Sequence, residues 1–369
     1  MNGLRKIRVL LAEDSRSQRE AISWVIGNAP YLALVGEAAN GAEAVEMVEQ
    51  LKPDIVLMDC HMPVMDGIEA TRIIMGRCPV PIVVTSATFD ANDVHPGLEA
   101  LHEGALAIVP KPLDPAAENF DRLAEELRLT LKLMADVKVV RRLPPRRAPA
   151  PPRPPQETAE RPADQPVDRP APMREAREIK IIAVGASTGG PPVVLDILRR
   201  LGPKLDVPML LVQHMSPGFI VGFASWLTRG SGLPVEVAAA DVVAAPGRVY
   251  VAPEGHHLGI DRRGRLTLDD GPPENGFRPS VSCLFRSVAD AFGREALAIL
   301  LTGMGQDGAD GLAYLGQKGG VTAVQDKESS VVFGMPAAAI RMGAAQRVLA
   351  PPDIAKFVLA QLARRRHLS

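Results

Sequence analysis

The chain has 369 residues, of which 46% are hydrophobic, and its 42 basic and 43 acidic side chains leave a formal net charge of −1. This length favours two domains over one core, and the balanced charge excludes a general attraction to nucleic acid or to an anionic membrane. Three widely spaced cysteines exclude a disulfide framework and a Cys/His zinc site, and the absence of a signal peptide or a membrane-length apolar run indicates a cytoplasmic protein.

Residues 1–134 alternate short apolar runs with amphipathic stretches. Between two of these runs, Ala44, Val45, Val48 and Leu51 recur at helical spacing. We expect strands at 9–12, 32–36, 55–58, 82–85 and 107–109. Five βα repeats in this length predict a (βα)5 doubly wound parallel sheet.

A proline-rich segment follows, with 11 of the 34 prolines of the chain between positions 144 and 172. Such a segment cannot bury a core, so we expect an extended, solvated linker over 135–178. Alternation then resumes over 179–369, with strands expected at 179–184, 207–212, 248–252, 297–301 and 321–324. A helix beginning near Pro191 and a β-hairpin turning at Arg263-Gly264 complete the prediction of a mostly parallel α/β sheet with an antiparallel hairpin.

Acidic residues follow two strands of the first predicted domain. Glu13 and Asp14 come at the end of the first strand, Asp59 at the end of the third, and Lys111 after the fifth. Because sites in parallel sheets form outside the carboxyl ends of the strands, we expect the three carboxylates to converge and to bind Mg²⁺. Asp59 is then the candidate phosphoacceptor, with Lys111 and Ser86 placed to contact the phosphoryl group. A single aspartate at a strand end is more often a helix cap, but matched positions on successive strands favour the site.

The second domain carries a serine, a histidine and an aspartate, each just after an apolar run. They are Ser187 in "VGASTGG", His214 in "VQHMSPG" and Asp307 in "LTGMGQDG". The chain order Ser, His, Asp differs from that of α/β-hydrolases, but the same triad geometry recurs on unrelated folds. We predict a nucleophilic triad, with Thr188, Gly189 and Met304 as candidate oxyanion donors.

Each triad residue also has a structural interpretation. Ser187 could cap a helix or bind phosphate, His214 could be a hydrogen-bonded structural histidine, and Asp307 could cap the next helix. Taken singly these are favoured, but three such residues at strand ends, with glycine around each, favour the triad. His256 and His257 sit beside the predicted hairpin, where an exposed or structural role is expected.

The first domain resembles the receiver domain of response regulators, through "AEDS", "MDCHMPVMDG", "VTSA" and "PKP" in that order. The resemblance implies that Asp59 is phosphorylated and that the backbone carbonyl of His61 also contacts the metal. Ile108 stands where receivers usually carry an aromatic residue, and weaker transmission of the phosphorylation signal is expected.

The second domain resembles the chemotaxis protein-glutamate methylesterases, through "VGASTGG", "QHMSPGF", "YVAPEGHHL", "DDGPPENGFRPSV", "LTGMGQDGA" and "VVFGMPAAAI". The resemblance implies hydrolysis of glutamate methyl esters, and deamidation of glutamines, on the cytoplasmic helices of chemoreceptors. Ser187 would be the nucleophile, His214 the general base and Asp307 its orienting partner. A chemotaxis histidine kinase would supply the phosphoryl group, and Mg²⁺ would serve the receiver while ester hydrolysis would need no cofactor.

Two other functions are compatible with the same residues. The second domain could be a non-catalytic output module that only binds a partner, although an intact triad argues against this. The chain could also be an esterase of a related signalling array that does not control motility, and the sequence does not separate this from chemotaxis.

Overall fold

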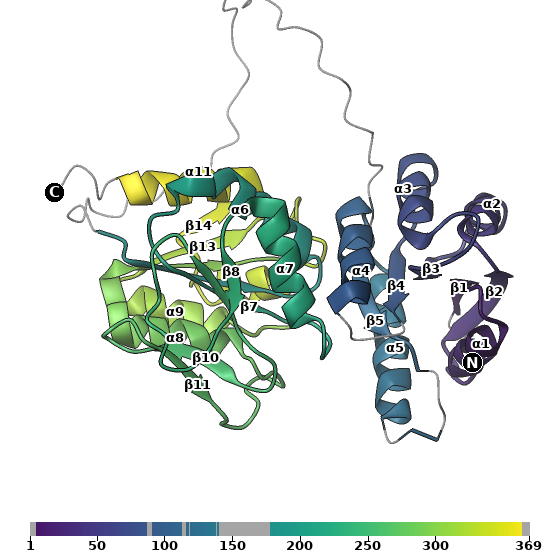
Figure 1. Cartoon of the computed structure of the whole chain (residues 1–369), viewed down its shortest axis with the longest axis horizontal. Coiled ribbons are helices and arrows are strands. Elements are labelled where there is room, and N and C mark those ends of the chain that lie inside the picture. The colour runs from purple at the N-terminus through teal and green to yellow at the C-terminus, as the bar shows by residue number, and fades with distance from the viewer. Residues whose placement is uncertain are drawn as a thin grey trace, which may run out of the picture.

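The computed structural model describes residues 5–86, 91–112, 116–117, 119–137, 139 and 178–363, without the side chains of 86 and 91–95. The predicted linker over 135–178 lies almost entirely outside the described residues. Two α/β domains are present, one before and one after it (Figure 1). Among the described residues, no helix is both long and apolar enough to span a membrane.

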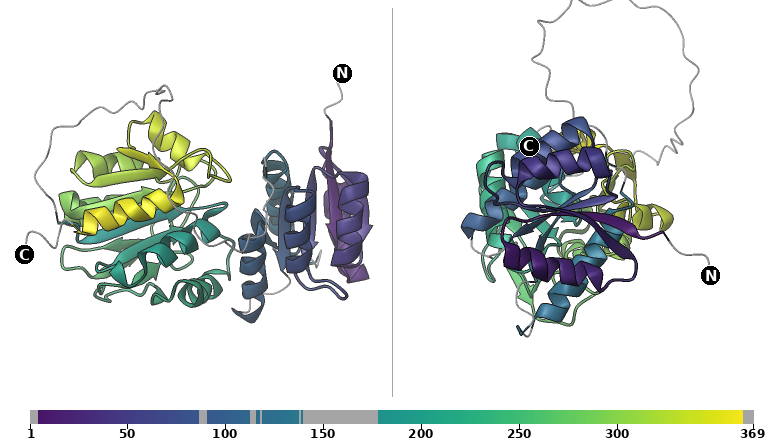
Figure 2. Two further views of the ribbon diagram at one scale, coloured as in Figure 1. Left: turned by 90° about the horizontal axis from the view of Figure 1, so that it is seen from above. Right: turned by 90° about the vertical axis from the view of Figure 1, so that its right-hand side faces the viewer.

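The first domain is a five-stranded parallel sheet in the order β2-β1-β3-β4-β5. Its elements are β1 (Ile7–Ala12), α1 (Arg16–Gly27), β2 (Leu32–Ala38), α2 (Gly41–Leu51), β3 (Ile55–Asp59), α3 (Gly67–Arg77), β4 (Ile82–Ser86), α4 (Ala91–Glu103), β5 (Ala107–Pro110) and α5 (Phe120–Met134). Helices cover both faces, as Figure 2 shows, so the strands are apolar on both sides and read as continuous runs. The predicted (βα)5 sheet is confirmed.

The second domain is a seven-stranded parallel sheet in the order β14-β13-β12-β6-β7-β9-β8. Its strands are β6 (Ile181–Ala186), β7 (Met209–Gln213), β8 (Val235–Val237), β9 (Val249–Val251), β12 (Ala296–Leu300), β13 (Val321–Gln325) and β14 (Arg347–Leu349). Its helices are α6 (Gly190–Leu201), α7 (Ile220–Ser231), α8 (Val281–Phe292), α9 (Ala309–Gln317), α10 (Met335–Arg341) and α11 (Pro351–Ala363), with 3-10 turns η1 (Gly202–Lys204) and η2 (Gly293–Glu295). The predicted hairpin, β10 (His257–Ile260) with β11 (Leu266–Asp269), forms a separate antiparallel sheet and is not part of the larger one.

Strand order places the site of the second domain. The first strand, β6, lies in the middle of the sheet, between β12 and β7. The chain therefore reverses its direction of winding between β6 and β12, and a crevice opens at the carboxyl ends of the strands around such a switch point. Helices α6, α7 and α11 cover one face, and α8, α9 and α10 cover the other.

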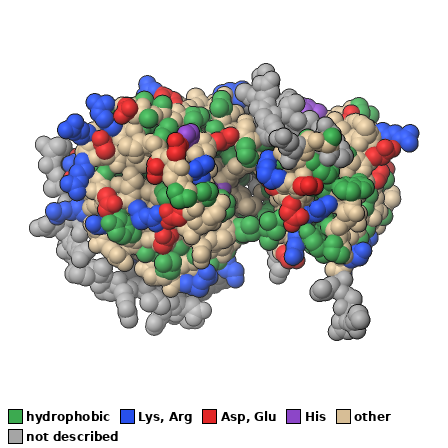
Figure 3. All heavy atoms as spheres, turned by 90° about the horizontal axis from the view of Figure 1, so that it is seen from below, with side chains coloured by type: hydrophobic (Ala, Val, Ile, Leu, Met, Phe, Trp, Pro, Cys, Tyr) green, Lys and Arg blue, Asp and Glu red, His purple; other side chains and the backbone are tan. Residues whose placement is uncertain are grey.

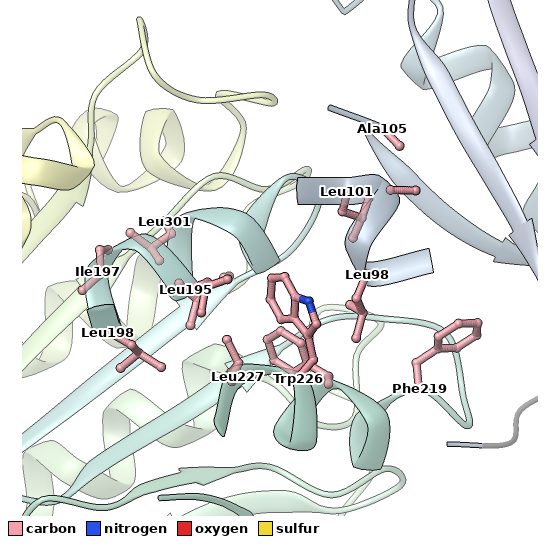
Figure 4. Packing of buried hydrophobic residues seen from close by; sticks show 14 of the residues in the cluster. Leu98, Leu101, Ala105, Leu195, Ile197, Leu198, Phe219, Trp226, Leu227 and Leu301 are labelled. Carbon is pink, nitrogen blue, oxygen red and sulfur yellow. The ribbon is translucent and has the colours of Figure 1, made fainter. Parts of the chain in front are cut away.

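The two domains pack against each other through α4 and α7, and one cluster of buried hydrophobic residues runs across the boundary. Leu98 and Leu101 on α4 face Trp226 on α7, which is 6% exposed (Figure 4). The domains appear as two lobes with hydrophobic side chains at their junction in Figure 3. The receiver-like domain therefore presents α4, β5 and α5 to the second domain.

Candidate active site

The acidic cluster of the first domain lies at the carboxyl ends of β1 and β3. Oxygen atoms of Glu13, Asp14 and Asp59 all lie within 4.8 Å of one another, and the side chains of Glu13 and Asp59 are buried. Lys111 Nζ lies 2.8 Å from Glu13 Oε2 and 2.9 Å from Asp59 Oδ2, and it donates to Gln18 Oε1 at 2.9 Å. Burial raises the pKa of Glu13, and the neighbouring Lys111 only partly offsets this. The side chain of Ser86 lies outside the described residues.

The three candidate triad residues follow three adjacent strands of the second sheet. Ser187 comes directly after β6, His214 directly after β7, and Asp307 after β12. Because the strands are parallel and neighbours, their ends meet at one edge, and all three residues are buried or nearly so. His214 Nε2 lies 3.0 Å from Asp307 Oδ2. The contact has the distance of an ion pair, and it joins the base to the acid of the candidate triad.

Asp307 is held as a carboxylate by the start of α8. Its oxygens accept hydrogen bonds from Ser280 Oγ at 2.8 Å, from the N–H of Val281 at 2.7 Å and from the N–H of Ser282 at 3.2 Å. The positive end of the α8 dipole adds to their effect. Burial alone would raise the pKa of Asp307, but His214 and these donors together bring it well below its ordinary value. Asp307 is therefore ionised at neutral pH.

Ser187 sits in a tight turn between β6 and α6. Its N–H donates to Thr302 O at 3.0 Å, and its carbonyl accepts from Gln213 Nε2 at 2.8 Å. A Cβ on Gly303 would lie 2.7 Å from Ser187 Cβ, so the segment after β12 can approach the serine this closely only with glycine at this position. Gly189 caps α6 with φ of 76°, a conformation that glycine adopts without strain.

The predicted oxyanion donors lie around this turn. Thr188, Gly189 and Met304 line the same hollow as Ser187. The backbone N–H groups of Thr188 and Met304 have no hydrogen-bond partner among the described residues. Donors left open beside a serine can stabilise a developing oxyanion.

A cavity of about 520 Å³ lies between the two domains at this site. Its lining includes Ile108, Glu126 and Thr130 from the first domain and Ser187, His214 and Met304 from the second. Ser216 Oγ, two residues after His214, donates to Glu126 Oε1 on α5 at 2.5 Å. Residues of the first domain therefore line the same cavity as the serine.

His256 and His257 make contacts of the structural kind that the sequence analysis expected. His257 is buried and accepts from the N–H of Ser280 through Nδ1, while Nε2 donates to Pro272 O. His256 is partly exposed and pairs with Asp270. His257 therefore holds Ser280, which in turn donates to Asp307, so His257 supports the triad without contacting it.

Cys283 lies in the first turn of α8, where its N–H donates to Ser280 Oγ. Burial, followed by the carboxylate of Glu274 that accepts from its Sγ at 2.8 Å, raises the pKa of Cys283 to about 12. At pH 8 only about one thiol in ten thousand is then ionised. We expect iodoacetamide to alkylate the half-buried Cys78 of the native chain and to leave Cys283 largely unmodified, as measured by mass spectrometry. Both should react in guanidinium chloride, and equal rates in the native chain would contradict this prediction.

Several residues of the site carry no signal in the sequence. Gln213 is buried and donates to the carbonyls of Ser187 and His214, so it ties two triad positions together. Asn275 donates to Asp307, and the ring of Phe277 stacks on His214. The string "ENGFRPSV" contains them, but no spacing rule connects a loop after a hairpin to a strand end elsewhere in the chain.

The fold and its two polar clusters define a response regulator whose output domain holds a serine, a histidine and an aspartate at one sheet edge. A family profile of the response regulator receiver domain matches residues 9–118, and one of the CheB methylesterase matches residues 182–358. The chain belongs to the protein-glutamate methylesterase/protein-glutamine glutaminase family.

Individual relatives match over nearly their whole length. Protein-glutamate methylesterase/protein-glutamine glutaminase 1 of Syntrophus aciditrophicus (strain SB) is 44% identical over 97% of this chain and 98% of its own. The enzyme numbered 4 of Myxococcus xanthus (strain DK1622) is 46% identical over 95% of each chain. Among solved structures, the catalytic domain of Thermotoga maritima CheB methylesterase is 36% identical, with a TM-score of 0.47, over 50% of this chain and 98% of that one.

Proposed function

We propose that the chain is a phosphorylation-regulated hydrolase that removes methyl esters from glutamate side chains of chemoreceptors and deamidates receptor glutamines. The observation that carries this proposal is the meeting of Ser187, His214 and Asp307 at the ends of three adjacent strands. The names of the curated relatives support the same activity. Ser187 is the nucleophile, His214 the general base, and Asp307 the group that orients it.

The reaction is an acyl transfer in two steps. Ser187 Oγ attacks the side-chain carbonyl of the substrate, and His214 takes its proton. His214 Nε2 faces Asp307, and Nδ1 is buried without a partner among the described residues, so Nδ1 is the nitrogen that serves the serine. The proton then passes to the leaving methanol or ammonia. Water, activated by His214, cleaves the acyl-enzyme and leaves a glutamate carboxylate.

Negative charge on the substrate oxygen is stabilised by backbone donors. The N–H groups of Thr188 and Met304 flank Ser187, with Gly189 shaping the turn between Ser187 and α6. Hydrogen-bond donors that are fixed before the reaction lower the barrier without a reorganisation cost. In this proposal ester hydrolysis uses these donors and requires no metal ion.

The acidic cluster of the receiver fits Mg²⁺. Three carboxylates supply hard oxygen donors within 4.8 Å of one another, and two of them are buried at a strand end. Glu13, Asp14 and Asp59 would hold the ion, together with the carbonyl of His61, and the ion supplies positive charge during phosphoryl transfer. Lys111 already contacts Asp59 and offsets charge there. We further propose that a chemotaxis histidine kinase is the phosphodonor.

Phosphorylation of Asp59 by acetyl phosphate is therefore expected to require Mg²⁺. Asp14→Asn removes an exposed carboxylate and should raise the Mg²⁺ concentration for half-maximal phosphorylation by about tenfold, since a carboxylate ligand is lost. Glu20→Gln changes an exposed residue of α1 and serves as the control. Phosphorylation is followed by mass spectrometry of the intact chain, and an unchanged yield in EDTA would refute the assignment.

The test of the proposed activity is methanol release from methylated receptor membranes by the phosphorylated full-length chain. The rival function, an output module that only binds a partner, predicts no methanol and no labelling of Ser187 by a fluorophosphonate probe. Rapid labelling of Ser187 without methanol release would keep the serine hydrolase and reject the receptor substrate.

A further inference from the structure

A short turn carries an aromatic ring onto the imidazole of His214. The ring centroids of Phe277 and His214 are 3.9 Å apart, and their planes differ by 3°. Glu274 and Phe277 exchange backbone hydrogen bonds of 3.0 and 2.9 Å around Asn275 and Gly276, which have φ of 53° and 84°. An Asn-Gly pair with both φ angles positive is the preferred composition of this tight turn, so local sequence fixes the shape of the turn that carries the ring.

The same turn reaches the acid of the triad. Asn275 Nδ2 donates to Asp307 Oδ1 at 3.3 Å. One turn therefore contacts both His214 and Asp307, although it follows the hairpin in sequence and belongs to neither strand end. A displacement of the turn would change both contacts at once.

Charged groups anchor this turn to two helices. Glu274 pairs with Arg286 on α8 and accepts from Cys283 Sγ at 2.8 Å. Arg286 is also 2.9 Å from Asp310 on α9, the helix that begins just after Asp307. These partners are only partly exposed, which makes the ion pairs less screened than surface ones. The anchor joins the turn to the same scaffold that holds the triad acid.

We propose that Phe277 is a positioning residue for the general base, and that Asn275 assists it through Asp307. This inference rests on the proposed function of His214. The contact of Nε2 with Asp307 fixes one end of the imidazole, and stacking on Phe277 fixes the plane of the ring. A parallel ring in contact with the imidazole restricts its rotation, because turning the imidazole would break the stacking. The ring therefore keeps Nδ1 directed at Ser187.

An alternative role for Phe277 is a wall of the substrate pocket, because it also lines the interdomain cavity. The two roles differ in kinetics. Loss of a wall weakens substrate binding and raises KM, whereas loss of positioning lowers kcat with little change in KM. The kinetic constants of one variant therefore separate them.

The experiment compares phosphorylated full-length chains on methylated receptor membranes. Phe277→Leu should lower kcat about tenfold and leave KM within about twofold, and Phe277→Tyr should restore most of kcat because it keeps the ring. Tyr314→Leu removes an aromatic ring that contacts Asp290 and Lys318 and should change neither constant. Thermal unfolding of each variant checks that the fold is retained.

A second variant tests the link to Asp307. Asn275→Gly keeps the positive φ that the turn needs and removes only the amide, and we expect a two- to fivefold loss of kcat. A raised KM with normal kcat in Phe277→Leu, or no restoration by Phe277→Tyr in a folded chain, would overturn the proposal.

The rate of fluorophosphonate labelling of Ser187 is measured in parallel, because it depends on His214 and not on the receptor. Slower labelling in Phe277→Leu supports positioning even if receptor membranes release no methanol, which would refute the proposed substrate alone. Equal labelling rates in the wild-type and Phe277→Leu chains would refute the positioning role.

Discussion

Replacing Ser187 with alanine is expected to lower methanol release from methylated receptors by at least about 10⁴-fold, which corresponds to about 5.5 kcal/mol of activation free energy. The fold should survive, because only the hydroxyl is lost and the backbone of Ser187 keeps its hydrogen bonds to Thr302 and Gln213. Initial rates of methanol release measure the effect. Ser231→Ala is the matched control, since its hydroxyl donates to a carbonyl within α7. Hydrolysis near the wild-type rate by Ser187→Ala would reject the mechanism.

The same mechanism predicts how large the loss of activity will be at the other two triad residues. Changes at His214 should be as severe as the loss of Ser187, and Asp307→Asn somewhat milder in activity, because an orienting group acts through the base. Asp307→Asn carries a second cost. The Asp307 carboxylate accepts from Val281, Ser282 and other donors, and an amide offers only one acceptor oxygen. Unpaired buried donors cost about 1–3 kcal/mol each, so a lower melting temperature should accompany the loss of rate.

Strand ends were the part of the site that the sequence could predict. Apolar runs mark the parallel strands, and Asp59, Ser187 and His214 stand where those runs stop. The sheet order then brings the residues together, because neighbouring parallel strands end at one edge. The short edge strands β8 and β14 were not predicted. Each has three residues with a charged side chain among them, whereas β9, of the same length, is buried throughout and forms an apolar run.

The supporting shell could not be predicted, because its members come from distant segments. Ser280, Asn275 and Phe277 reach the triad through the loop after the hairpin. Their types are common in loops and at helix caps, where Ser280 in fact caps α8. Only tertiary packing shows that the same residues also hold the acid and the base. The hydrogen bond from Ser216 to Glu126 could not be predicted either, because it joins two distant segments of the chain.

Breaking the contact between the domains is expected to raise activity in the unphosphorylated chain. Glu126 accepts a hydrogen bond from Ser216 beside the active site, and it belongs to the receiver, not to the catalytic domain. A hydrogen bond to a charged group contributes about 1.5–3 kcal/mol, and about 1.4 kcal/mol of bias corresponds to tenfold in the open population. We therefore expect Glu126→Ala to raise the basal rate of methanol release by at least about tenfold. Glu125→Ala, at an exposed neighbouring position, should leave it unchanged.

Phosphorylation of Asp59, or removal of residues 1–177, should act in the same direction by uncovering Ser187. The long linker lowers the effective concentration of the receiver at the site, and Ile108 lacks the aromatic ring typical of receivers, so the gain from phosphorylation should be modest.

Separation of the receiver from the catalytic domain can be followed by fluorescence. The chain has only two tryptophans, and one of them, Trp226, is buried beneath α4. In a Trp24→Phe chain, phosphorylation should shift the emission of Trp226 to longer wavelength as water reaches it. Equal rates for the unmodified, phosphorylated, shortened and Glu126→Ala chains, with no shift in emission, would show that the receiver does not gate the triad and would assign it a role in localisation instead.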